Sequence, residues 1–465
     1  MTTQPKETVE KFQNVNRAVG KYRWTICALV FFATTINYLD RQVLSLLQPR
    51  LEELFGWTNS DYANITAVFQ FTYAISMLLA GRIIDKLDTR WGYGWAIIIW
   101  SVGAIVHALA LPVGEGIASV FALVGIGAVS VSVAGFMFSR AVLAFGEAGN
   151  FPAAIKAIAE YFPKRERSLA TGIFNSGANI GAILAPITVP WIYLHWGWEA
   201  AFIIIGCIGF LWMFFWLVFY EKPEKQKRLS AQELSYIHSD EERHTQPEAT
   251  EKVSWVRLLG YKQTWAFAFG KFMTDGVWWF FLFWLPAYLK AQYGIIDKAV
   301  TLPLALLYTL AMVGSVGGGW FPMHFIKKGY TVYDGRMRAM LVIALFPLFI
   351  LAAQPLGSIS YWLPVLFIGI GASAHQAWSA NIFTTVSDMF PKKAVGSVVG
   401  IGGMAGGLGA VLLTKLGGAL FDHYKALGHI ETGYTIMFTI CSAAYLVAWR
   451  VMKTLVPKYS PITDL

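Results

Sequence analysis

The chain has 465 residues, of which 56% are hydrophobic and 14% are charged. An ordinary water-soluble domain carries about 25% charged residues, so this composition excludes a soluble protein and requires a lipid bilayer as solvent. The net charge of +9 does not indicate nucleic-acid binding, because the basic residues gather in loops between apolar stretches. We therefore expect a membrane protein without a nucleic-acid partner.

Residues 1–23 form a polar tail of mixed charge and lack the short apolar core of a secretory signal peptide. Beyond it, stretches of about 20 apolar residues, long enough to cross a bilayer as helices, recur along nearly the whole chain. They predict an all-α membrane protein with twelve transmembrane helices in two six-helix bundles, 24–220 and 264–453, a cytoplasmic linker, 221–263, and a C-terminal tail, 454–465. The spans are predicted at 24–48, 60–82, 93–112, 131–159, 167–192, 199–220, 265–290, 300–323, 337–354, 361–385, 394–421 and 432–453.

Lysine and arginine are distributed unevenly over the predicted loops. One side of the membrane holds most of them, whereas the other side holds only Arg50, Lys290, Lys298 and Lys425. Basic loops stay in the cytoplasm, so both termini and the linker are predicted to be cytoplasmic, which requires an even number of spans. The apolar stretch 116–130 would make a thirteenth span. We therefore interpret it as an extension on the outer side, with no assigned role.

The linker carries one local signal of structure. Ser230 and Glu233 have the spacing of a capping box, which predicts a short helix along the membrane surface. A disordered tether is the alternative interpretation.

The cysteines give no sign of a metal site. Cys27, Cys207 and Cys441 lie singly in apolar stretches, without the spacing of metal ligands or of a disulfide framework. We interpret them as packing residues and expect no metal and no cofactor.

A charged turn, Gly81 to Arg90, lies between the second and third spans. Glycine permits close helix approach, and Asp85 can cap a helix or pair with a cation, so Gly81, Asp85, Lys86 and Arg90 are candidates for a conformational latch. An ordinary topology-setting loop is the alternative. The spacing Gly-x-x-x-Asp-Lys-x-x-x-Arg, with the twelve spans, resembles the major facilitator superfamily. In the C-terminal half Met323 stands at the acidic position, so any latch is expected to be asymmetric.

Five further motifs resemble the anion:cation symporter family, and the last two of them resemble bacterial hexuronate transporters in particular. They are 37–41 (Asn-Tyr-Leu-Asp-Arg), 146–152 (Gly-Glu-Ala-Gly-Asn-Phe-Pro), 162–167 (Phe-Pro-Lys-Arg-Glu-Arg), 270–279 and 374–379 (Ala-His-Gln-Ala-Trp-Ser). The resemblance implies a monomeric, multi-pass transporter of a bacterial inner membrane. The insert 116–130 departs from the pattern of typical hexuronate transporters.

Charged residues lie inside three of the predicted spans. Asp40 and Arg41 are about 24 Å of helical rise into the first span. Arg140 and Glu147, seven residues apart on the fourth, share a helix face. On the seventh, Lys271 and Asp275 have the i,i+4 spacing of a pair. Ionisable residues in spans cost a few kcal/mol each and usually face a cavity or mark an ion path.

These charges suit the transport of an anion with a proton. A carboxylate cargo needs permanent cations, for which Arg41 and Arg140 are the first candidates, followed by Lys271. A proton carrier needs a carboxyl group whose protonation responds to its surroundings, and the family resemblance favours Asp40 and Glu147. Asp275 is the third candidate proton carrier. The alternative is that each pair only neutralises itself and locks helices together, most of all Lys271 with Asp275.

A sugar acid also presents hydroxyls and an apolar ring face, which call for polar and aromatic walls. The candidate lining residues are Tyr73, Asn175, His375, Gln376 and Trp378. For a single aromatic residue, core packing or the membrane interface is the more common role. A helix-to-helix hydrogen bond explains His375 equally well.

We therefore expect a secondary active transporter that imports a hexuronate, glucuronate or galacturonate, by proton symport with alternating access. A symporter of another organic anion, such as an aldonate, stays open. A membrane sensor that binds sugar acids without moving them is less favoured. An enzyme is not expected, because no metal cluster or nucleophile motif is present in the sequence.

Overall fold

The computed structural model describes residues 20–123, 130–240 and 254–465, which form helices and short connections without a strand. The all-α prediction is confirmed for these residues. The N-terminal helices are α2 (Tyr22–Phe55), α3 (Asn59–Val106), α4 (Ala110–Leu123), α5 (Val131–Glu147), α6 (Asn150–Tyr161), α7 (Lys164–Phe219) and α8 (Ala231–Ile237). The C-terminal helices are α9 (Trp255–Leu258), α10 (Lys262–Tyr293), α11 (Thr301–Lys327), α12 (Val332–Leu345), α13 (Ala353–Gly357), α14 (Trp362–Met389), α15 (Lys392–Ala426) and α16 (Ile430–Leu455).

Local sequence signals fix where the first helices end and begin. Helix α2 ends at Gly56, whose φ of 67° is readily adopted only by glycine, and the Gly56 N–H donates to the Glu52 carbonyl. Helix α3 begins with a capping box in which the Thr58 hydroxyl accepts from the Asp61 N–H at 3.0 Å. The Asp61 carboxylate in turn accepts from the Thr58 N–H at 2.9 Å. The chain therefore turns sharply between these two helices.

Two of the long helices contain a break. Helix α3 is interrupted at Asp88, with φ 69° and ψ 153°, and α7 at Gly197, with φ 86° and ψ 175°. Each break lies between two apolar stretches that the sequence predicts as separate spans. A positive φ at a single residue ends one helix and starts the next without a longer loop.

The number of spans stays a prediction. Eight helices are long and apolar enough to cross a membrane, and one of them, Ala170–Phe219, contains the break at Gly197. Helices α2, α10 and α14 are long but are not among these eight. They are the helices that carry much of the polar and charged sequence singled out above.

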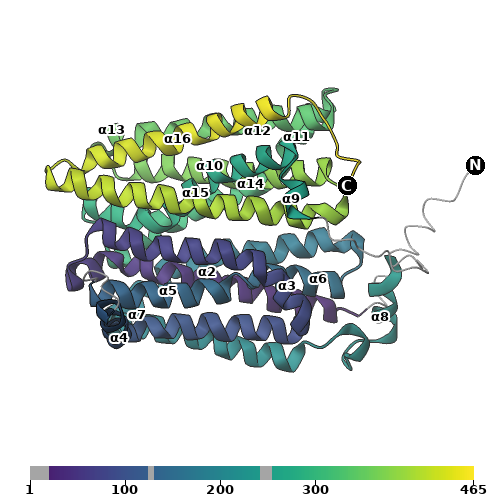
Figure 1. Ribbon diagram of the computed structural model, residues 1–465, viewed down its shortest axis with the longest axis horizontal. Coiled ribbons are helices and arrows are strands. Elements are labelled where there is room, and N and C mark those ends of the chain that lie inside the picture. Colours follow the sequence, from purple (N-terminus) through teal and green to yellow (C-terminus); the bar gives the residue numbers. More distant parts are fainter. Residues whose placement is uncertain (1–19, 124–129, 241–253) are drawn as a thin grey trace, which may run out of the picture.

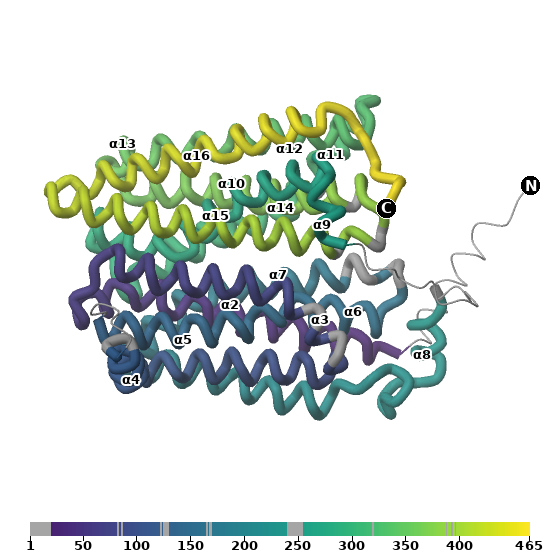
Figure 2. Tube along the Cα trace, viewed as in Figure 1, coloured from purple at the N-terminus to yellow at the C-terminus, as the bar shows by residue number. Residues whose placement is uncertain are grey.

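The long helices run side by side in two groups (Figures 1 and 2). Helices α2, α3, α5, α6 and α7, here called the N-terminal half, pack together, and α10 to α16, the C-terminal half, pack beside them. Helices α2, α3, α10 and α15 supply contacts between the halves. We call the end where α2 begins the Tyr22 end, and the end where it finishes the Gly56 end. Both described chain termini lie at the Tyr22 end (Figure 1).

Glycines allow the helices to approach closely. A Cβ atom at Gly409 of α15 would collide with the carbonyl oxygen of Phe272 on α10, and one at Gly181 of α7 would collide with that of Thr35 on α2. Small residues permit such backbone contact between membrane helices. The contact of α15 with α10 places the glycine-rich stretch of α15 against the helix that carries Lys271 and Asp275.

The stretch 116–130 forms part of α4 as far as Leu123, and residues 124–129 lie outside the described part of the chain. Helix α4 is seen end-on at the Gly56 end, so it crosses the direction of the long helices (Figures 1 and 2). Its Gly114 lies against the backbone of Val131 at the start of α5. The placement of α4 agrees with the prediction that this stretch extends the bundle. Its direction differs from the direction of the long helices.

The linker helix α8 confirms the predicted helix at Ser230, whose hydroxyl accepts from the Glu233 N–H at 3.1 Å. Glu233 is buried, and its carboxylate accepts from the N–H groups of Tyr22 and Arg23 at 3.1 and 3.0 Å. It also pairs with the Arg23 guanidinium at 3.2 Å. Helix α8 therefore caps the first long helix of the N-terminal half.

Candidate functional site

A buried ion pair joins α2 to α5 within the N-terminal half. The Arg41 guanidinium donates from Nε and Nη2 to Oε2 of Glu147 at 2.9 and 2.8 Å, and Nη2 also reaches Oδ1 of Asn37 at 3.2 Å. Both side chains of the pair are 2% exposed or less. Breaking a buried pair typically costs 3–5 kcal/mol, roughly, because one charge is left uncompensated. Arg41 and Glu147 are therefore mutually held.

Four aromatic rings surround the Arg41 guanidinium. Its central carbon lies 4.7 to 5.3 Å from the ring centroids of Tyr38, Phe69, Tyr73 and Trp279. Trp279 comes from α10, so the C-terminal half reaches across to this arginine. Cation–π contacts of this kind strengthen when they are shielded from water. These four rings, here called the aromatic box, hold the orientation of the Arg41 guanidinium and stabilise its positive charge.

Arg140 on α5 is buried but incompletely paired. Its Nη2 donates to the Arg41 carbonyl at 3.3 Å, while Nε and Nη1 have no hydrogen-bond partner among the described residues. The guanidinium lies 5.1 Å from the Phe69 ring and 5.8 Å from that of Phe283 on α10. An arginine with free donors in a buried site is suited to bind an anionic group with its planar fork.

Two carboxylates in the N-terminal half keep unpaired oxygens. Asp40 is 2% exposed, and neither of its oxygens has a hydrogen-bond partner in the described part of the protein. Glu147 holds Arg41 with one oxygen, and its other oxygen, Oε1, is likewise without a partner there. A buried ionised carboxylate without donors is costly, so these groups are suited to take up a proton.

The C-terminal half contributes a second polar cluster. Nζ of Lys271 lies 2.7 Å from Oδ2 of Asp275 on the same helix, which gives the predicted i,i+4 pair. On α14, the His375 ring stacks on Trp278 with centroids 5.3 Å apart and lies 2.9 Å from the Tyr445 hydroxyl. His375 thus makes both an aromatic contact and a helix-to-helix hydrogen bond.

The other predicted lining residues occupy different surroundings. Tyr73 is in the aromatic box, and Trp378 is fully buried, with its ring against Tyr445 at 5.6 Å. Gln376 is half-buried on α14, whereas Asn175 is exposed on α7 and is not brought into the cluster. The role of each in binding stays a prediction.

Of the four candidate latch residues, Arg90 is the one whose side chain lies in the described part of the chain. Its side chain pairs with Glu221 and donates to the Leu217 carbonyl at 2.8 Å, so it binds the end of α7 within its own half. The side chains of Gly81, Asp85 and Lys86 lie outside the described part of the chain.

Sequence reasoning missed several residues of the site. Tyr38 and Phe69 form half of the aromatic box, and Tyr445 binds His375. In a chain that is 15% aromatic, no single ring stands out. Only the charge of Arg41, which attracts rings, could have directed attention to Tyr38 three residues away.

Polar contacts between the halves gather at the Gly56 end. Arg50 pairs with Asp297 at 2.5 Å, and Asp422 accepts from the N–H groups of Asn59 and Ser60 at 2.7 Å each. Two further pairs, Lys290 with Glu53 and Lys425 with Glu52, measure 2.9 and 2.8 Å. We call these contacts the Gly56 gate. They hold the halves together at that end.

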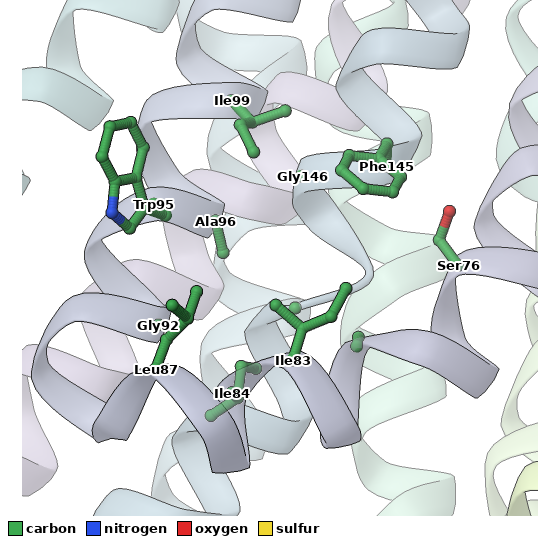
Figure 3. A pocket seen from close by; sticks show the side chains of 12 residues that line it. Ser76, Ile83, Ile84, Leu87, Gly92, Trp95, Ala96, Ile99, Phe145 and Gly146 are labelled. Carbon is green, nitrogen blue, oxygen red and sulfur yellow. The ribbon is translucent and has the colours of Figure 1, made fainter.

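Figure 3 shows an apolar pocket within the N-terminal half. It has a volume of about 280 Å³ and is lined by residues of α3 and α5, among them Trp95 and Phe145. Among the described lining residues, the polar atoms of side chains are the Ser76 hydroxyl and the Trp95 indole N–H. No lining residue in the described part of the chain is a cation, so those residues do not favour an anionic ligand.

The fold, the buried charges and the gate between two halves define a membrane transporter. The family model described as the Major Facilitator Superfamily matches residues 30–414. This match extends over most of the chain, and the chain belongs to the Major Facilitator Superfamily, a family of transporters and not of enzymes.

Similar proteins have names that refer to sugar acids. The hexuronate transporter of Escherichia coli (strain K12) is 29% identical over 442 residues, which cover 94% of this chain and 95% of that protein. The galacturonate transporter of Dickeya chrysanthemi is 32% identical over 66% of this chain and 83% of its own length. A probable galactarate/D-glucarate transporter of Escherichia coli (strain K12) is 25% identical, with 90% and 92% covered.

The fold is also found in solved structures. The crystal structure of a D-xylose-proton symporter matches with a TM-score of 0.70, 14% sequence identity, and coverage of 96% of this chain and 99% of that chain. At this identity the similarity concerns the fold alone.

Proposed function

We propose that this protein imports a hexuronate, such as galacturonate or glucuronate, by symport with a proton. The observation that carries the proposal is the buried cluster of Arg140, with two free donors, beside Asp40 and Glu147, with free oxygens. Such a cluster supplies a binding site for a carboxylate and a carrier for a proton in one place. The names of the similar sugar-acid transporters support this cargo.

Arg140 is proposed to bind the cargo carboxylate, because Arg41 is already held by Glu147 and the aromatic box. Protonation of Glu147 would weaken its pair with Arg41 and free that second guanidinium for the cargo. Asp40 is the other proton carrier. Tyr73, His375, Gln376 and Trp378 are proposed to contact the sugar, together with Lys271. Asn175 on α7 stays a candidate contact, and Asp275 on α10 stays a third candidate proton carrier.

The charges of the site balance in a way that supports one proton for each monoanion. Three cations and three carboxylates, all ionised, sum to zero; they are Arg41, Arg140, Lys271, Asp40, Glu147 and Asp275. A monocarboxylate adds one negative charge, and one proton restores neutrality. Neutral sites are favoured when the halves move in a medium of low dielectric constant.

Alternating access is proposed to occur by rocking of the two bundles, 24–220 and 264–453, around this site. The basic loops favour a cytoplasmic Tyr22 end, and with it a cytoplasmic linker, 221–263, and cytoplasmic tails, 1–23 and 454–465. The Gly56 gate then closes the outer side, and the structure corresponds to a state closed toward the outside. Latch residues Gly81, Asp85, Lys86 and Arg90 would act at the cytoplasmic end.

The test is uptake of labelled galacturonate by proteoliposomes with an acidic exterior. We expect accumulation that stops when the proton gradient is collapsed. Neutral galactose should not compete, because it lacks the carboxylate that Arg140 binds. Accumulation that is unaffected by the collapsed gradient would exclude proton coupling, and equal transport of galactose would exclude selection for the anion.

A second candidate cargo is another sugar acid, such as an aldonate. It carries the same carboxylate and similar hydroxyls, so the N-terminal cluster would bind it equally well. Competition of gluconate or galactonate with labelled galacturonate separates the two candidates.

A further inference from the structure

The Lys271–Asp275 pair lies on α10, in the half opposite the N-terminal cluster. Asp275 lies one helical turn before Trp278 and Trp279 on α10. Trp279 stacks over the Arg41 guanidinium at 5.0 Å, and Trp278 stacks on His375. One turn of helix is about 5.4 Å. The carboxylate of Asp275 is therefore placed next to the residues that join the two halves around the site.

The two members of the pair differ in access. The Lys271 side chain is 8% exposed, and its Nζ lies over the Phe383 ring at 4.4 Å. The Asp275 side chain is 16% exposed, and Lys271 takes only its Oδ2. Some fully buried side-chain atoms of the described residues lack a hydrogen-bond partner, and Oδ1 of Asp275 does not belong to that group. The carboxylate is thus the member that a cargo molecule meets.

The absence of a side chain at a neighbouring glycine leaves space for the Asp275 carboxylate. Gly406 of α15 faces it, and a Cβ atom at that position would collide with Oδ2 of Asp275. Gly409, one turn further, brings the backbones of α15 and α10 together. A larger residue at Gly406 would displace the carboxylate from its place beside Lys271.

We propose that Asp275 is the residue that selects monocarboxylates over dicarboxylates, an inference that rests on the proposed function. When Arg140 binds the cargo carboxylate, the rest of the molecule extends toward α10. A carboxylate accepts hydrogen bonds and donates none, so Asp275 binds the hydroxyls at the far end of a hexuronate. A second carboxylate there, as in an aldarate, meets a like charge and brings no proton to donate. Specificity then comes from repulsion of the wrong cargo.

The charge balance leads to the same conclusion. A dicarboxylate would leave the site with an additional negative charge beyond that which one proton can offset. In Asp275→Asn, the site gains one positive charge and Lys271 loses its partner. The freed ammonium then attracts the second carboxylate, and the amide accepts and donates hydrogen bonds.

The experiment measures selectivity without a proton gradient. Labelled galacturonate counterflow into proteoliposomes is inhibited by unlabelled galacturonate or by galactarate, each at pH 6 and pH 7.5. In the wild type we expect galacturonate to inhibit at lower concentration than galactarate. In Asp275→Asn the ratio of the two inhibitory concentrations should shift toward galactarate by about tenfold or more.

Two variants complete the design. Glu115→Gln, on the exposed side of α4, is the matched acid-to-amide control and should keep the wild-type ratio. Asp275→Asn with Lys271→Gln removes both charges, so its ratio should still shift toward galactarate relative to the wild type, but by less than in Asp275→Asn alone. This second variant also tests the proposal if the single variant fails to fold.

An unchanged ratio in Asp275→Asn would overturn the proposal. So would a variant that keeps the ratio but loses gradient-driven uptake, because Asp275 would then carry a proton and not select the cargo. Failure of the proposed function looks different: the wild type itself would then show no galacturonate counterflow.

Discussion

At the scale of single residues, the shape of Arg140 matters as much as its charge. Arg140→Lys keeps one positive charge but loses the planar fork that can bind both oxygens of a carboxylate. We expect the KM for galacturonate to rise by about tenfold, the cost of roughly one charged hydrogen bond. Uptake kinetics in proteoliposomes measure this change. Arg450→Lys, on the exposed side of α16, is the control, and an equal rise in KM there would contradict the prediction.

The site also shows where prediction from sequence stops. Charges in apolar spans predict that Arg41, Arg140 and Glu147 are important, because burial of a charge is costly. Yet Glu147 is seven residues from Arg140 on one helix and pairs instead with Arg41, 106 residues away. Partner choice depends on how α2 and α5 pack, which no spacing within one helix encodes. Asn175, a polar residue in a predicted span, is exposed and apart from the cluster for the same reason.

At the scale of helices, packing of α15 against α10 predicts a contrast between two glycines. Gly409→Ala would force apart the backbones of α15 and α10, because its Cβ would meet the Phe272 carbonyl. We expect a lower Tm in thermal unfolding of the purified protein in detergent. Gly403→Ala is the matched control, since nothing lies within 4 Å of its Cβ, and alanine favours helix by about 1 kcal/mol. Equal Tm values for the two variants would contradict this account of the packing.

Helix boundaries were predicted better where a local signal exists. The capping residues Ser230 and Thr58 begin helices in the structure, and Ser230 was recognised from the sequence. The break at Asp88 lies within the charged turn Gly81 to Arg90, which the sequence shows, whereas the break at Gly197 has a positive φ but no flanking polar loop. Apolar content alone therefore locates the stretches on either side and leaves the break itself to tertiary packing.

At the scale of the whole molecule, the Gly56 gate determines which side is closed. Lys290 donates a hydrogen bond to Glu53 and holds the pKa of that carboxyl below its ordinary value. A lowered pKa means that the pair stabilises the closed state at neutral pH and is lost only as pH falls through that lower value. Mild acidification therefore leaves this part of the gate intact. In the proposed symport, the proton therefore acts elsewhere, which favours the buried carboxylates.

The contact of Asp422 with α3 allows a direct test of the Gly56 gate. It accepts the backbone N–H groups of Asn59 and Ser60, so a residue of α15 caps α3 across the two halves. Asp422→Ala should shift the equilibrium toward opening at the Gly56 end by about tenfold or more. Spin labels at Leu54 and Leu427, both exposed at that end, in a cysteine-free background would report longer distances. Asp61→Ala, which removes a cap of α3 within one half, should leave the distances unchanged; lengthening in both variants would mean that helix fraying, and not the gate, controls the opening.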